Sequence, residues 1–122
     1  MSSTAVPISG QDGSERRRST RVPLEMPLQL LVDGEVLAAR TVLGNRQGVL
    51  AYSPKLCARG SIIEARNAAT GRSTRVRVAW AWVEREGGTK TIRLALEKAD
   101  AAPSAWEEEY EGRLREEAAG AG

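Results

Sequence analysis

Residues 75–98 read RVRVAWAWVEREGGTKTIRLALEK, and this stretch decides the fold. Apolar residues recur at every second position on both sides of Gly87-Gly88, which is the period of a strand with one buried face. Two consecutive glycines also suit the type I′ turn of a tight hairpin. The tryptophans continue the face of the valines, so we expect core packing for them rather than base stacking. The predicted core-facing residues are Val76, Val78, Trp80 and Trp82 on one strand and Ile92, Leu94 and Leu96 on the other.

Four further strands are expected upstream of this hairpin. Residues 24–32 alternate with the same period, and Asp33-Gly34 is a second type I′ turn signal. Pro23 and Pro27 fall on the outward register. Because proline cannot donate to a ladder, we expect an edge strand, or one paired mainly on one side near its start. The other expected strands cover residues 36–42, 49–52 and 61–67, and a glycine-bearing loop over residues 43–48 joins the first two of these.

Six short strands with no helix between them predict an all-β fold. We expect a six-stranded antiparallel barrel of split, Greek-key-like type over residues 16–102, preceded by a disordered leader over residues 1–15, which are rich in Ser and Gly. A C-terminal helix is expected over residues 103–119, with Ser104 as its cap and Glu107 completing a capping box. The apolar stripe that would dock this helix on the barrel consists of Trp106, Tyr110 and Leu114.

The composition argues against an enzyme and against a membrane span. The chain has no histidine, the commonest general base, and its single cysteine, Cys57, excludes an intramolecular disulfide and a Cys-rich metal site. We expect Cys57 to be a small, semi-buried hydrophobic residue. No apolar run is long enough to span a membrane, and we expect a cytoplasmic protein without metal or cofactor. A solvated helix face, rather than an acid/base or metal site, is expected for Glu107, Glu108, Glu109, Glu111, Glu116 and Glu117, because consecutive helical residues point in different directions.

An arginine-rich run lies between the leader and the first strand. Its guanidinium groups, from Arg16, Arg17, Arg18 and Arg21, suit bidentate contact with phosphate and stacking on a flat base. The run therefore indicates an anionic ligand. The alternative is a basic segment that is simply solvated.

Together these features resemble a PilZ domain. The resemblance covers about residues 15–110 and rests on the spacing Arg17-x-x-x-Arg21 just before the first strand, the six strands, the glycine-bearing loop and the C-terminal helix. It implies binding of the bacterial second messenger cyclic di-GMP. In the family, the RxxxR segment contacts the phosphates and stacks on guanine, and a [D/N]xSxxG motif supplies polar groups to the guanine edge.

The two family motifs match this chain unequally. Arg17 and Arg21 match the first, with Arg16 and Arg18 as basic neighbours. If Gly48 is the glycine of the second, Leu43 takes the Asp/Asn position and Asn45 the Ser position. Leucine cannot hydrogen-bond a guanine, whereas Asn45 offers an acceptor and two donors. The alternative is a plain connecting loop in which Gly48 permits a bulge.

We therefore expect a non-enzymatic cyclic di-GMP sensor whose N-terminal arginines close on the ligand and change the surface offered to an unidentified protein partner. The alternative is a degenerate PilZ-like domain that has lost the nucleotide and acts as a protein-interaction module. DNA or RNA binding is not expected. Single strands need an exposed stacking platform, and the aromatic residues are predicted to be buried. The arginines that such binding would use are Arg66, Arg72, Arg75 and Arg77.

Overall fold

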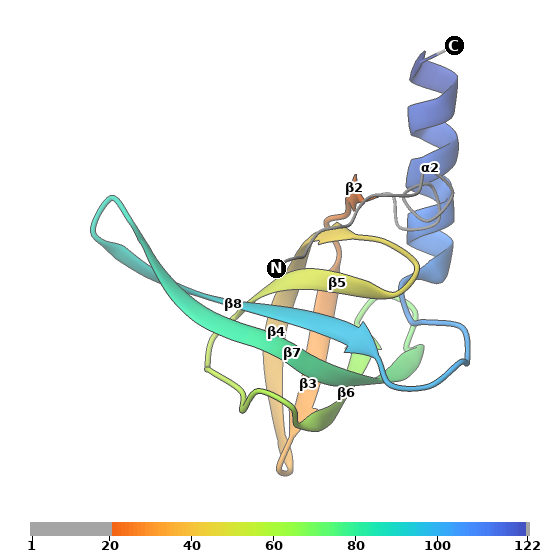
Figure 1. The fold of residues 1–122 in the computed structure, drawn as a ribbon. Helices are drawn as coiled ribbons and strands as arrows, with labels where there is room; N and C mark the ends of the chain where they lie inside the picture. The colour runs from red at the N-terminus through yellow and green to blue at the C-terminus, as the bar shows by residue number, and fades with distance from the viewer. Residues whose placement is uncertain (1–20, 122) are drawn as a thin grey trace, which may run out of the picture.

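The computed structural model describes residues 21–121 as a β-sheet closed on itself and followed by one helix (Figure 1). Its elements are β2 (Val22–Pro23), β3 (Pro27–Val32), β4 (Glu35–Gly44), β5 (Gly48–Ser53), β6 (Ile62–Asn67), β7 (Ser73–Glu86), β8 (Thr89–Lys98) and α2 (Glu107–Ala121). The strands hydrogen-bond in the order β2-β4-β3-β6-β7-β8-β5, and a further pairing of β4 with β5 closes six of them into an antiparallel barrel, with β2 as an extra strand. The predicted fold class is confirmed.

Both predicted hairpin turns are present, and one buried cluster fills the barrel. Asp33 and Gly34 have φ angles of 51° and 79°, and Gly87 and Gly88 have φ angles of 56° and 85°, as a type I′ turn requires. Cys57 is more buried than expected, since it belongs to this cluster, and burial raises the pKa of its thiol. The cluster also includes Leu28, Leu30, Ala51, Ala65, Val76, Val78, Leu94 and Leu96.

The predicted core positions of Trp80 and Trp82 are wrong. Val78 pairs with Leu96 but Trp80 pairs with Ala95, so β7 carries one extra residue, a β-bulge, between the two pairs. The bulge exchanges the two faces of the strand from this point on. Trp80 is therefore 55% exposed, and Trp82 is partly exposed.

The first predicted strand is interrupted, and β3 is not an edge strand. The Thr41 hydroxyl from β4 accepts a hydrogen bond from the Met26 N–H at 3.0 Å and donates to the Leu24 carbonyl, which separates β2 from β3. β3 lies between β4 and β6. Pro27 is tolerated because it is the first residue of the strand.

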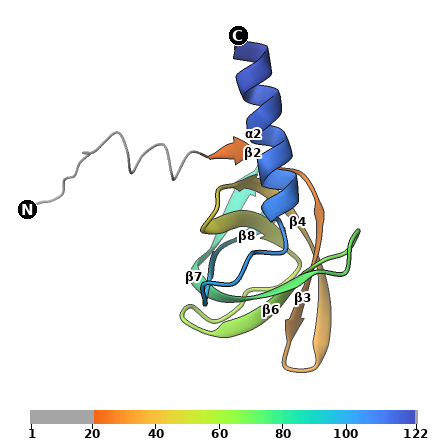
Figure 2. The same cartoon turned by 90° about the vertical axis from the view of Figure 1, so that its right-hand side faces the viewer.

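Helix α2 begins at Glu107, later than the predicted start at residue 103 with Ser104 as the cap. The Ser104 hydroxyl is buried and has no hydrogen-bond partner among the described residues, so the predicted capping box is wrong. The chain is held there by the barrel instead, because the Ala105 N–H donates to the Thr74 hydroxyl. The predicted docking stripe is confirmed: Trp106 and Tyr110 are buried, and Leu114 packs on the core. Beyond this stripe the helix projects away from the barrel (Figures 1 and 2).

The acidic face of α2 is only partly solvated, which corrects the expectation for it. Glu109 accepts a hydrogen bond from the Asn67 side-chain amide at 2.9 Å. Glu108 pairs with Arg72 at 3.1 Å. These carboxylates therefore attach the first turn of the helix to the turn between β6 and β7.

Candidate functional site

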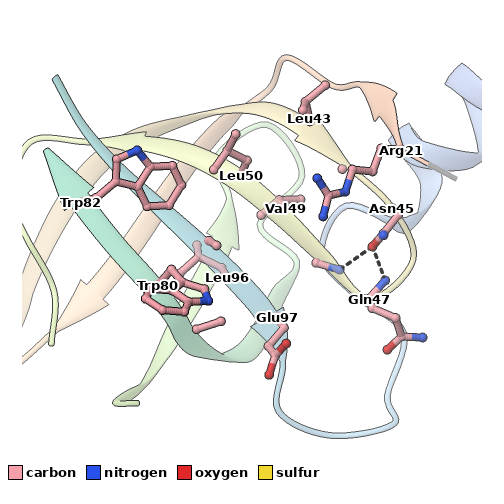
Figure 3. Close-up of a pocket in the computed structure, with 14 residues that line it drawn as sticks. Arg21, Leu43, Asn45, Gln47, Val49, Leu50, Trp80, Trp82, Leu96 and Glu97 are labelled. Carbon is pink, nitrogen blue, oxygen red and sulfur yellow. Dashed lines mark hydrogen bonds between the residues drawn. The ribbon is translucent and has the colours of Figure 1, made fainter. Parts of the chain in front are cut away.

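A cleft of about 680 Å³ opens on the outside of the barrel, beside the start of the described chain. One side is formed by Arg21 and by the loop between β4 and β5, and the other by Trp80 and Trp82 on β7 (Figure 3). Side chains of β5 and β8 lie between the two sides. The cleft thus places cationic, amide and aromatic groups around one cavity.

Asn45 shapes the loop that borders the cleft. Its side-chain oxygen accepts hydrogen bonds from the Gln47 and Gly48 N–H groups, both at 2.9 Å, and its own N–H donates to the Gly48 carbonyl at 2.9 Å. The Asn45 side chain thus acts as the hydrogen-bond acceptor that a backbone carbonyl would otherwise be in a tight turn. The side-chain oxygen that the sequence offered to a ligand is therefore already bound within the loop.

Gly48 is needed for close strand approach, and the alternative interpretation, that it permits a bulge, is wrong. A Cβ atom at Gly48 would lie 2.3 Å from the carbonyl oxygen of Leu96 on β8. The bulge lies instead in β4, where Thr41 pairs with Ala51 but Leu43 pairs with Leu50. Gly48 thus allows β5 to bring the loop against β8.

Helix α2 and Trp106, the residue just before it, hold the same loop. The Trp106 indole N–H donates to the Asn45 carbonyl at 2.8 Å. Arg46 pairs with Glu111 at 2.5 Å and lies 5.6 Å from the centre of the Tyr110 ring. Burial raises the pKa of Tyr110, and this effect is opposed by Arg46 and reinforced by Glu111. The Trp106 hydrogen bond and the Arg46–Glu111 ion pair thus hold the loop against the start of α2.

The helix also reaches the segment that carries Arg21. The Arg113 side chain donates from Nε to the carbonyl of Pro23 at 3.0 Å. Pro23 belongs to β2, which begins one residue after Arg21. Both borders of this side of the cleft, the loop and the N-terminal segment, are thus in contact with α2.

Trp80 and Trp82 form an aromatic wall opposite Arg21 and Asn45 (Figure 3). They lie two residues apart on β7 and so share its outward face. The Arg59 guanidinium lies 3.7 Å from the centre of the Trp80 ring. A cation at this distance holds the exposed indole by cation–π attraction.

An apolar row forms the floor of the cleft. Leu43 is the cross-strand neighbour of Leu50, Leu50 of Ala95, and Ala95 of Trp80. The row crosses β4, β5, β8 and β7, and all of its members line the cleft. The leucine that departs from the family motif therefore contributes to a continuous apolar surface.

The structure brings three of the six predicted site residues together, since Arg21, Asn45 and Gly48 all line the cleft. Arg16, Arg17 and Arg18 lie outside the described residues. Among the cleft residues that the sequence interpretation missed are Trp80, Trp82 and Glu97.

The comparison with protein-family models found no match to this chain, and the search of curated proteins found no significant match. Within residues 21–121, no three His, Cys, Asp or Glu side chains gather as metal ligands would. No helix in that range is both long and apolar enough to cross a membrane.

Proposed function

We propose that this protein is a PilZ-like, non-enzymatic sensor that binds cyclic di-GMP in the cleft between Arg21 and the two tryptophans. The observation that carries the proposal is the meeting of Arg21, the Asn45 loop and the aromatic wall around one cavity. The ligand carries two phosphates and two flat bases, and it needs both cationic and aromatic partners.

Each part of the cleft matches one part of this ligand. A guanidinium group binds a phosphate through two parallel hydrogen bonds. Arg21 supplies one such group at the border of the cleft, and Arg17, outside the described residues, precedes it by four positions. The indoles of Trp80 and Trp82 offer faces on which a base can stack. The apolar floor favours burial of that base.

Helix α2 is the element that would report binding to a partner protein. Its Glu111 pairs with Arg46 of the loop and its Arg113 contacts β2, while Trp106, the residue just before the helix, donates to the Asn45 carbonyl. A ligand that draws the N-terminal arginines onto the cleft would therefore alter contacts of α2. The projecting part of this helix is where a partner would detect the change (Figure 2).

Calorimetric titration with cyclic di-GMP tests the proposal. Because Arg17 and Arg21 would make charge-assisted bonds to phosphate, Arg17→Ala and Arg21→Ala are each expected to weaken binding roughly tenfold or more. Trp80→Ala is expected to weaken it by a similar factor through lost stacking. Arg115→Ala removes the same charge from an exposed position on α2 and should leave the affinity unchanged. Absence of binding at about 100 μM ligand, or equal affinity of all four variants and the wild type, would reject the proposal.

A degenerate domain that binds a protein instead of the nucleotide is the second candidate. The apolar row from Leu43 to Trp80 favours it, because a surface of this kind can pack against a partner. The Asn45 side-chain oxygen, already bound within its loop, favours it too. A pull-down in which Trp80→Ala removes a partner whose capture does not depend on cyclic di-GMP would support this candidate.

Nucleic-acid binding is a less favoured alternative. In its favour, the exposed Trp80 and the partly exposed Trp82 could stack on bases. However, three of the four arginines that would hold a polyanion are paired with carboxylates: Arg66 with Glu64, Arg72 with Glu108 and Arg77 with Glu97. We therefore expect no salt-dependent retention on single-stranded DNA or RNA.

A further inference from the structure

Glu97 places a carboxylate in the cleft at a position that the family motif does not use. It lies on β8 directly opposite Gly48 of β5, next to the loop that carries Asn45. Figure 3 shows Glu97 between Trp80 and this loop. Its side chain is 45% exposed, so a ligand in the cleft can reach it.

The Glu97 carboxylate is held in place and keeps one oxygen available. Arg77 donates to it from Nε at 3.1 Å and from Nη2 at 2.5 Å, and both bonds end on Oε1. Among the described residues, no hydrogen bond ends on Oε2. A carboxylate accepts about four hydrogen bonds in total, so the contact with Arg77 leaves capacity for a ligand.

We propose that Glu97 makes the cleft selective for guanine, which deepens the proposed function and rests on it. The Watson–Crick edge of guanine presents two neighbouring donors, N1–H and the N2 amino group, and a carboxylate can accept from both. Adenine presents an acceptor at N1, which a carboxylate repels. A base stacked on Trp80 would lie beside Glu97, because Trp80 pairs with Ala95 and Glu97 follows two residues later on the same face of β8.

This arrangement also explains how the chain could tolerate Leu43. The family motif supplies a polar group at that position from the loop side, where this chain has an apolar one. Glu97 supplies a polar group from β8 instead. In this chain the hydrogen-bond acceptor for the guanine edge would thus come from Glu97 on β8 rather than from residue 43.

The test compares two variants that break the same ion pair, each titrated with cyclic di-GMP and with cyclic di-AMP. Glu97→Gln removes the negative charge of the carboxylate. Arg77→Ala removes the arginine that pairs with Glu97 but leaves the Glu97 carboxylate itself in place. The wild type is expected to prefer cyclic di-GMP. Glu97→Gln is expected to reduce this preference roughly tenfold or more. Arg77→Ala is expected to retain it, and circular dichroism of both variants checks that they are folded.

Three other results would overturn the inference. If Glu97→Gln keeps the wild-type preference, or if Arg77→Ala loses it equally, the ion pair is structural and the inference is overturned. If the wild type binds both cyclic dinucleotides equally, the inference fails while nucleotide binding stands. If the wild type binds neither, the proposed function and the inference fail together.

Discussion

Trp106→Ala is expected to lower the free energy of unfolding by about 3–5 kcal/mol, the usual cost of removing a buried large aromatic side chain. Trp106 is 0% exposed and lies in the core cluster between α2 and the barrel. Its removal leaves a cavity and also takes away the indole donor to the Asn45 carbonyl. Chemical denaturation followed by circular dichroism measures the change as a lower transition midpoint.

Trp80→Ala is the matched control for this substitution. It deletes the same side chain from a position that is 55% exposed, where the main contact is the stacked Arg59. We expect a loss of about 1 kcal/mol or less, since little apolar surface returns to water and no cavity forms. If both variants lower the free energy of unfolding equally, Trp80 must be buried in the core, and the exchange of faces at the β7 bulge is wrong.

The sequence was sufficient for the barrel because its strands follow a simple pattern. Each predicted strand alternates around buried residues such as Leu28, Val76 and Leu94, and two glycine-containing pairs fix the hairpins. The pattern fails after Val78, where residues 79–83 read AWAWV. With no polar residue among them, either face could be the inner one, and only pairing with β8 decides the register.

The site was predictable only where its residues are close in sequence. Arg21, Asn45 and Gly48 were found because short motifs carry them. Trp80 and Glu97 reach the same cleft through the pairing of β5, β8 and β7. No short sequence motif indicates that Trp80 and Glu97 lie in the same cleft as Asn45. The helix start was missed for a related reason, since contact with Thr74 on β7, rather than a capping side chain, holds the chain before α2.

Gly48→Ala is expected to lower the free energy of unfolding by about 3 kcal/mol, the upper part of the usual range for inserting a methyl group where there is no space. The new Cβ would lie 2.3 Å from the Leu96 carbonyl oxygen. That oxygen belongs to the backbone of a central strand, so it cannot move aside as a side chain would. Relief requires β5 to separate from β8, which also displaces the Asn45 loop from the cleft. Urea denaturation should therefore show a clearly lower midpoint, and any binding of cyclic di-GMP should weaken as well.

The same substitution at Gly112 separates this steric effect from the general effect of replacing glycine. Gly112 lies within α2, and a methyl group added there would meet no atom outside its own helix within 4 Å. Gly112→Ala should therefore stabilise the protein by about 0.5–1 kcal/mol through its better helix propensity. Gly44→Ala should fall between the two, because its nearest neighbour, at 2.7 Å, is the end of the flexible Leu24 side chain. The expected order of stability is Gly112→Ala, then Gly44→Ala, then Gly48→Ala. A Gly48→Ala variant as stable as the wild type would mean that β5 and β8 do not approach this closely, and the position of Glu97 beside the loop would lose its support.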